Sequence, residues 1–287
     1  MLNREKIVLS FIRNAKKTVS KFQLMKWVFL FGQKHKLTKF NHFYKFVPYK
    51  YGPFSFTLNH ELEKLINTRY ISVDTKKRMS LSREVEAPTI DGELSLEISI
   101  FLKKYKTLTD KELTEKVYKI YPWFTVNALD PKLRLQKLPT AKKAVYTIGY
   151  EGLLVDEFFD ILLSKGIKTL IDIRNNPVSR RFGFHRSTLS NICKNLNIEY
   201  HHFPKLGIPS TLRAPLETKE DYRKLFKKYK NNMLSTENKV VEEATKLIET
   251  KPSVLVCMES DFRLCHRMPL GKIISEKTKL PIIDLRR

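Results

Sequence analysis

The chain has 287 residues, more than one domain usually holds, which predicts two domains that are each large enough to form a core. Hydrophobic residues make up 42% of it, with 18 Phe and 12 Tyr, and this content excludes a disordered chain. The formal charge of +24, from 54 Lys and Arg against 30 Asp and Glu, favours a polyanionic partner; a Lys-rich habit of the source genome is the alternative.

The sequence predicts that the protein neither spans a membrane nor works in an oxidising compartment. No apolar run approaches the roughly 20 residues that span a bilayer, and the segment after Met1 lacks the order of a signal peptide. The three cysteines, an odd number, argue against a disulfide scaffold: Cys193, Cys257 and Cys265. These features predict a cytoplasmic protein that makes no contact with a membrane.

The basic character begins at the N-terminus, where residues 1–50 hold 12 Lys or Arg and one acidic residue. Apolar positions at helical spacing from Arg4 to Gln33 predict two helices, and the Ser20 hydroxyl is suited to cap the second. Two prolines and a glycine within 46–55 break this pattern before it resumes. We therefore predict a helix, a turn and a further helix.

A family resemblance appears at this turn. The segment Lys50-Tyr51-Gly52-Pro53-Phe54-Ser55 resembles the "YGP" segment of the Panacea antitoxin domain family, and residues 108–113 fit the same pattern. The resemblance implies a small helical domain that holds a partner and carries no catalytic residues. Residues 1–128 are thus predicted as a basic, helix-turn-helix-like or partner-binding domain. The alternative is a plain helical domain with Tyr51, Phe54 and Trp123 in its core, because large aromatic side chains are usually buried.

A linker is predicted at 129–143, which contains two prolines and five Lys or Arg without sustained apolar periodicity. Residues 144–287 then alternate short apolar strands with helices. The strands are expected at Ala144–Ile148, Thr169–Ile173, Ile198–Phe203, Ser253–Cys257 and Pro281–Leu285, and the helices near 153–164, 186–196, 219–231, 236–249 and 267–276. This order predicts an α/β fold with a largely parallel, Rossmann-like sheet and flanking helices.

Polar residues follow four of these strands. In an open parallel sheet, ligands bind beyond the carboxyl ends of the strands, so these positions are candidates for a site. They are Tyr150 and Glu151; Asp172, Arg174, Ser179 and Arg180; His201 and His202; and Cys257, Glu259, Cys265, His266 and Arg267. Consecutive strand residues point to opposite faces, so only one of His201 and His202 can reach the site.

The same segments resemble a known family. Tyr146–Gly152, Ile171–Arg174 with Pro177 and Ser179, Leu206-Gly207 with Pro209, and Cys257-x-Glu259 with Cys265-His266-Arg267 are similar to the family called domain of unknown function 488. The resemblance implies a fold and a set of motif positions, without an established reaction. At Leu206-Gly207-Ile208-Pro209, members often have a second glycine, which leaves the shape of that loop open.

Three residues are assigned to catalysis. Asp172 and Glu259 are paired carboxylates suited to nucleophilic or acid–base work in glycosidic cleavage, with His266 beside them. Substrate and phosphate binding is assigned to Tyr150, Glu151, Arg174, Ser179, Arg180, His202, Cys257, Cys265 and Arg267, because guanidinium groups and a helix N-terminus favour anions. The alternatives are a plain Asp172–Arg174 salt bridge, a solvated Glu259 and a packed Cys265.

The predicted function is hydrolysis of nucleic acid, with DNA preferred over RNA, at a glycosidic bond in the manner of a glycosylase or at a phosphodiester, in repair or defence. The Arg- and Phe-containing loop 178–186 suits contacts to phosphates and bases. No cofactor and no metal are expected, because the cysteines lack the CxxC pair typical of structural zinc.

Two other functions stay open. One is a non-catalytic DNA-binding or antitoxin module of a defence locus, with a protein partner for the N-terminal domain. The other is a thiol enzyme, because Cys257 and Arg263 mimic a Cys-x5-Arg phosphate loop, although the glycines of such a loop are absent.

Overall fold

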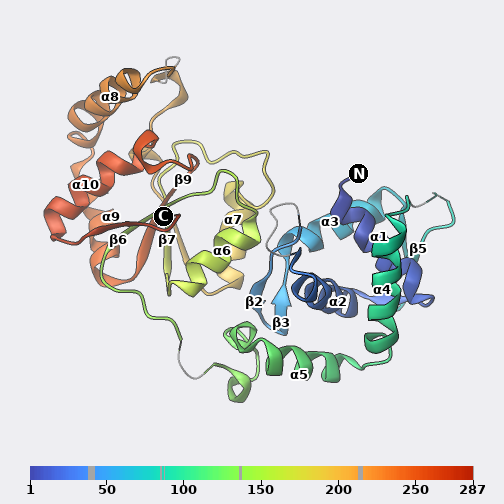
Figure 1. Cartoon of the computed structure of the whole chain (residues 1–287). Helices are drawn as coiled ribbons and strands as arrows, with labels where there is room; N and C mark the ends of the chain where they lie inside the picture. The colour runs from blue at the N-terminus through green and yellow to red at the C-terminus, as the bar shows by residue number, and fades with distance from the viewer. Residues whose placement is uncertain (38–42, 85, 87, 136–137, 213–215, 287) are drawn as a thin grey trace. The chain divides into compact units, whose positions relative to one another are not determined.

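The computed structural model describes residues 1–37, 43–84, 86, 88–135, 138–212 and 216–286. The chain divides into two compact units, Met1–Lys137 and Leu138–Arg287 (Figure 1). Of the predicted linker 129–143, residues 136 and 137 lie outside the described residues. The part before them includes a single 3-10 turn, Pro131–Leu133.

The N-terminal unit is mainly helical. Its helices are α1 (Asn3–Ala15), α2 (Lys21–Lys34), α3 (Phe56–Asn67), α4 (Gly92–Tyr105) and α5 (Asp110–Ile120). A hairpin joins β2 (Val47–Tyr49) to β3 (Gly52–Phe54), and a small antiparallel sheet has the order β1 (Val19–Ser20), β5 (Arg78–Leu81), β4 (Ile71–Val73). These short strands, which the helical periodicity did not predict, connect the helices.

The two helices predicted at the N-terminus are confirmed, as is the cap between them. The Ser20 hydroxyl accepts a hydrogen bond from the Gln23 amide at 3.0 Å and so satisfies an orphan donor of the first turn of α2. The core contains fully buried rings from both helices, among them Phe11 and Trp27. The predicted burial of Tyr51 is wrong: it is 58% exposed because it lies at the turn of the β2–β3 hairpin.

The C-terminal unit contains a parallel sheet of five strands, as predicted. The strands are β6 (Val145–Gly149), β7 (Thr169–Asp172), β8 (Glu199–His202), β9 (Ser253–Cys257) and β10 (Ile282–Asp284), in the order β10-β6-β9-β7-β8. β6, β7 and β9 are buried along their whole length, which explains their continuous apolar runs. The fold is Rossmann-like.

Helices cover both faces of this sheet. They are α6 (Val155–Ser164), α7 (Arg186–Asn195), α8 (Lys219–Lys228), α9 (Asn238–Thr250) and α10 (Arg267–Thr278). Figure 1 shows α6 and α7 on one face and α9 and α10 on the other. Leu255 and Cys257 of β9 share a core cluster with Ile248 and Ile274 of α9 and α10. Among the described residues, no helix is both long and apolar enough to cross a membrane.

Candidate functional site

A pocket of about 300 Å³ lies at the carboxyl ends of the parallel strands. The segments that follow β6, β7, β8 and β9 all contribute to its wall. Its lining residues are Tyr150, Arg174, Asn175, Asn176, Val178, Ile208, Ser210, Cys257, Met258 and Glu259. The strand ends therefore converge on one polar pocket, as the strand–helix alternation implied. Six of these residues were not assigned to catalysis or binding: Asn175, Asn176, Val178, Ile208, Ser210 and Met258. The signal for Asn175, Asn176 and Ser210 was a polar side chain in a loop that follows β7 or β8.

The loop after β9 is held tightly against the end of β6. A Cβ on Gly149 would lie 1.7 Å from the carbonyl oxygen of Glu259, so only glycine fits this approach. The amides of Tyr150 and Glu151 donate to the carbonyls of Cys257 and Met258 at 3.2 and 2.9 Å. The Glu151 carboxylate accepts from the Ser260 amide at 2.9 Å. Glu151, predicted to bind substrate, thus holds the loop that presents Glu259.

Arg267 holds the same loop from inside the protein. Its side chain is 0% exposed, and its guanidinium donates to the carbonyls of Glu259 and Ser260 at 2.5 and 3.2 Å. It also forms an ion pair with Asp284 at 3.7 Å. A guanidinium buried in this way cannot reach a phosphate, so the structure assigns Arg267 a positioning role in place of the predicted phosphate contact.

Asp172 and Arg174 form a buried, bidentate ion pair. Nε and Nη2 of Arg174 donate to the two carboxylate oxygens at 2.8 and 2.6 Å, and the Tyr200 hydroxyl donates to Oδ2 at 2.8 Å. The Asp172 side chain is 0% exposed. A carboxylate with both oxygens occupied in this way is a poor nucleophile or base, so the structure favours the salt-bridge interpretation over the catalytic one.

Arg174 also organises the wall of the pocket. Nη1 donates to the Tyr150 hydroxyl at 3.2 Å and to the Phe184 carbonyl at 2.8 Å, and the Tyr150 and Phe184 rings stack with centroids 4.2 Å apart. Burial by itself would lower the pKa of Arg174, but the Asp172 carboxylate more than compensates and raises it.

The segment that follows Arg174 is buried at one ring and exposed at its arginines. Phe184 is fully buried, whereas Arg180 and Arg186 are exposed. Arg180 and Arg186, but not Phe184, are therefore accessible to a ligand.

The remaining predicted residues lie at the edge of the site or outside it. The His202 Nε2 atom is 2.8 Å from the Arg174 carbonyl, whereas the His201 Nε2 atom is 3.6 Å from Glu199 on the strand's other face. His202 is thus the histidine turned toward the end of β7. The Ser179 hydroxyl accepts from the Arg181 amide at 3.1 Å, and Ser179 does not line the pocket.

Four side chains of reactive type meet beside the pocket. The Glu259 Oε2 atom is 3.0 Å from the Sγ atoms of both Cys257 and Cys265, and His266 Nδ1 is 3.6 and 4.0 Å from the same sulfur atoms. Both cysteines and His266 are buried, and Glu259 is partly buried. These residue types bind metal ions, so the spacing argument against a metal site, which considered only a CxxC pair, does not hold. The sequence signal was the density of such residues, four within positions 257–266.

The electrostatics of this cluster keep Glu259 ionised. Burial alone would raise the pKa of Glu259, but hydrogen bonds from the Cys257 and Cys265 thiols lower it overall. Burial also raises the pKa of Cys265. For His266, burial opposes the charged form, yet the neighbouring Cys265 and Glu259 raise its pKa. The carboxylate is therefore the charged group that the cluster presents to the pocket.

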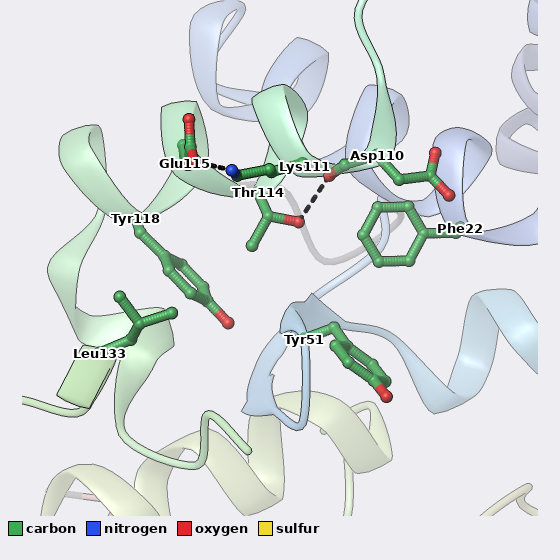
Figure 2. Close-up of a pocket in the computed structure, with 8 residues that line it drawn as sticks. All are labelled: Phe22, Tyr51, Asp110, Lys111, Thr114, Glu115, Tyr118 and Leu133. Atoms are coloured by element: carbon green, nitrogen blue, oxygen red, sulfur yellow. Dashed lines mark hydrogen bonds and ion pairs between the residues drawn. The ribbon is translucent and has the colours of Figure 1, made fainter. Parts of the chain in front are cut away.

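A larger pocket, of about 640 Å³, lies in the N-terminal unit (Figure 2). It is lined by Phe22, Tyr51, Asp110, Lys111, Thr114, Glu115, Tyr118 and Leu133. Figure 2 shows the rings of Phe22, Tyr51 and Tyr118 around the opening, with the Lys111–Glu115 ion pair at its edge. The aromatic lining suits an apolar contact and contains no grouping of nucleophile and base among the residues drawn.

The comparison with protein families supports the resemblance found in the C-terminal half. The family model described as "Domain of unknown function DUF488" matches residues 154–274. The matched range covers β7, β8 and β9 and includes Asp172, Arg174 and the Cys257–Arg267 segment. Comparison with curated proteins and with solved structures gave no match. The similarity therefore supports the fold of this unit and the position of its motifs, and it identifies no reaction.

Replacing Gly149 with Ala is expected to destabilise the C-terminal unit by about 1–3 kcal/mol, because the added methyl group overlaps the Glu259 carbonyl. Urea unfolding followed by amide hydrogen exchange of the sheet would measure this loss. The matched control is Gly271→Ala in α10, where a Cβ meets no atom closer than 3.9 Å, so the stability should be unchanged or slightly higher. Equal effects of the two substitutions would contradict the close approach at Gly149.

Proposed function

We propose that the C-terminal unit is a hydrolase that acts on nucleic acid, with DNA preferred over RNA, and that Glu259 is its reactive carboxylate. One observation carries the proposal. Glu259 lines the pocket at the strand ends beside two thiols and an imidazole, whereas the carboxylate of Asp172 is fully engaged by Arg174 and Tyr200. Of the two carboxylates predicted to react, Glu259 is thus the one with access to a substrate.

The chemistry follows from the state of this carboxylate. A glutamate carboxylate is ionised near neutral pH, so Glu259 can accept a proton from a water molecule in the pocket that it lines. The water oxygen then attacks the anomeric carbon or the phosphorus of a substrate that contacts Asn176 and Ser210, which also line the pocket. The bond to the base or to the sugar oxygen breaks, and the leaving group takes up the proton that Glu259 accepted. His266 is buried and contacts the Cys257 thiol, so it supports the cluster without touching the substrate.

The case for a nucleic acid rests on charge and on size. The segment 178–186 has three arginines and no acidic residue, and its Arg180 and Arg186 are exposed. Together with the net charge of +24, these exposed arginines are suited to contact phosphates of a nucleic acid. A volume of about 300 Å³ suits one nucleotide, and a base in duplex DNA would have to be flipped out to enter. Whether the bond is glycosidic or a phosphodiester depends on the position of that nucleotide.

A thiol enzyme is the second candidate, and one distance favours it. Cys257 lines the pocket and its Sγ is 3.6 Å from Nδ1 of His266, which is a nucleophile and a base near contact distance. The Cys-x5-Arg comparison gains no support, because Arg263 is exposed and pairs with Asp261 at 2.8 Å.

The substitution Glu259→Gln is expected to lower turnover at least about 100-fold, as removal of a general base does. The assay incubates the full chain with labelled single-stranded DNA, duplex DNA and RNA and measures cleavage and base release. The matched control is Glu243→Gln, an exposed position on α9, which should leave the rate unchanged.

Three outcomes would contradict the proposal. Turnover that survives Glu259→Gln excludes the carboxylate as the base. Turnover that survives it but is abolished by Cys257→Ser identifies the thiol enzyme. Binding that weakens steeply with salt, with no turnover of any substrate, identifies a non-catalytic module.

A further inference from the structure

The four side chains beside the pocket are arranged like the ligands of a metal ion. The ligand atoms of Cys257, Glu259, Cys265 and His266 all lie within 4.8 Å of one another. They come from different local structures: Cys257 ends β9, Cys265 ends a 3-10 turn and His266 is the N-cap of α10. Two thiols, an imidazole and a carboxylate, the residue types that bind zinc in proteins, therefore meet at one point.

The distances between the ligand atoms are close to those of tetrahedral coordination. At the usual zinc–sulfur and zinc–nitrogen bond lengths, two ligands of one ion lie roughly 3.5–3.8 Å apart. The Sγ atoms of Cys257 and Cys265 lie 3.6 and 4.0 Å from His266 Nδ1. The Glu259 oxygen, at 3.0 Å from both sulfur atoms, must move outward by a few tenths of an ångström once the thiols lose their protons to an ion. The four ligand atoms, none more than 4.8 Å from another, can thus surround one small ion after modest shifts of their side chains.

The orientation of His266 supports the same conclusion. Its Nε2 atom is 3.1 Å from the carbonyl oxygen of Ile173, an acceptor that requires a proton on Nε2. The tautomer with Nε2 protonated leaves the lone pair on Nδ1, the atom that faces the two sulfur atoms. A backbone carbonyl that orients the far nitrogen of a histidine is the usual outer contact of a metal-binding imidazole.

We propose that Cys257, Glu259, Cys265 and His266 bind one zinc ion. Two thiolates and an imidazole favour zinc over magnesium or calcium, which prefer oxygen ligands. Cys265 and His266 do not line the pocket, whereas Cys257 and Glu259 do. The ion would thus be anchored from the interior, with its carboxylate ligand on the side that a substrate approaches.

The role of the ion, unlike its binding, rests on the function proposed above. A zinc ion held by Cys257, Cys265 and His266 would polarise a water molecule that enters from the pocket and so make it a better nucleophile. Glu259, the carboxylate among the four groups and a residue that lines the pocket, would accept the proton that this water gives up. The ion would thus assist the proton-accepting role assigned to Glu259.

The test is to measure zinc in the full chain purified without chelators, and then to replace zinc with cobalt(II) under anaerobic conditions. We expect about one zinc per chain and, with cobalt, an intense thiolate-to-metal charge-transfer band with visible bands of tetrahedral coordination. Cys257→Ala and Cys265→Ala each remove a ligand, so each should weaken zinc binding by more than about 100-fold. Loss of a residue that only hydrogen-bonds a ligand costs roughly 10- to 100-fold. The matched control is Cys193→Ala, a buried cysteine of α7 that is absent from the cluster and should leave the zinc content unchanged.

The inference is overturned if the purified chain holds no zinc and the chelator-treated chain binds none when it is added. It is also overturned if cobalt(II) binds but the absorption spectrum lacks a thiolate-to-metal charge-transfer band, a test that uses the unmodified chain. The third contrary result is an intact mass that shows a disulfide between Cys257 and Cys265. Zinc bound at full occupancy without turnover would leave this inference standing and remove the proposed function. Turnover that depends on Glu259 in a zinc-free chain would do the reverse.

Discussion

Replacing Asp172 with Asn is expected to destabilise the C-terminal unit by about 3–5 kcal/mol, the cost of breaking a buried ion pair from one side. The substitution removes the charge that balances Arg174 while its guanidinium stays buried. An amide also cannot accept all the hydrogen bonds that Arg174 and Tyr200 now donate to the carboxylate. Urea titration with amide hydrogen exchange read at β7 and β9 would measure the change.

Asp261→Asn is the matched control for this prediction. Asp261 also pairs with an arginine two residues away, Arg263, but that arginine is exposed, and the pair should contribute less than about 1 kcal/mol. If Asp172→Asn left stability intact and abolished only turnover, the salt-bridge interpretation would fail and the catalytic role predicted for Asp172 would return.

The N-terminal unit is expected to become more stable as the pH rises from about 7 to about 9, because of Lys26. Burial lowers the pKa of Lys26 from 10.5 to about 7, partly opposed by the charge of Asp110. Its Nζ donates to the carbonyls of Tyr51 and Pro53 and lies 4.9 Å from the Phe22 ring. Between these two pKa values the unfolded chain binds a proton that the folded chain lacks. Stability therefore rises by about 1.4 kcal/mol per pH unit, roughly 3 kcal/mol in all, and levels off below pH 7.

Tryptophan fluorescence is the measurement for this prediction, since both tryptophans of the chain, Trp27 and Trp123, belong to the N-terminal unit. Urea midpoints recorded from pH 6 to 9 give the slope. In Lys26→Met the titrating group is gone, so this slope should flatten even though the two carbonyls lose their donor. A slope that persists in the variant would show that another group is responsible.

Local patterns in the sequence were sufficient for the first helices of the N-terminal unit and for the strand–helix order of the C-terminal unit. The strands and helices from Ala144 onward were predictable because apolar periodicity, glycines and prolines act over a few residues. The antiparallel pairing of β1, β4 and β5 was not, because strands as short as Val19–Ser20 carry no periodic signal. Tyr51 was placed in the core by its residue type alone, and the turn of a two-stranded hairpin exposes it.

For the site, the sequence by itself determined which residues stand at the strand ends, since the carboxyl ends of parallel strands meet at one edge of the sheet. Only the tertiary structure decided which partners each of them contacts. Asp172 and Glu259 look alike in the sequence, yet one is enclosed by Arg174 and Tyr200 and the other faces a pocket beside two thiols and an imidazole. The physical reason is that backbone preference is local, whereas the state of a carboxylate depends on partners that only folding brings within 3 Å.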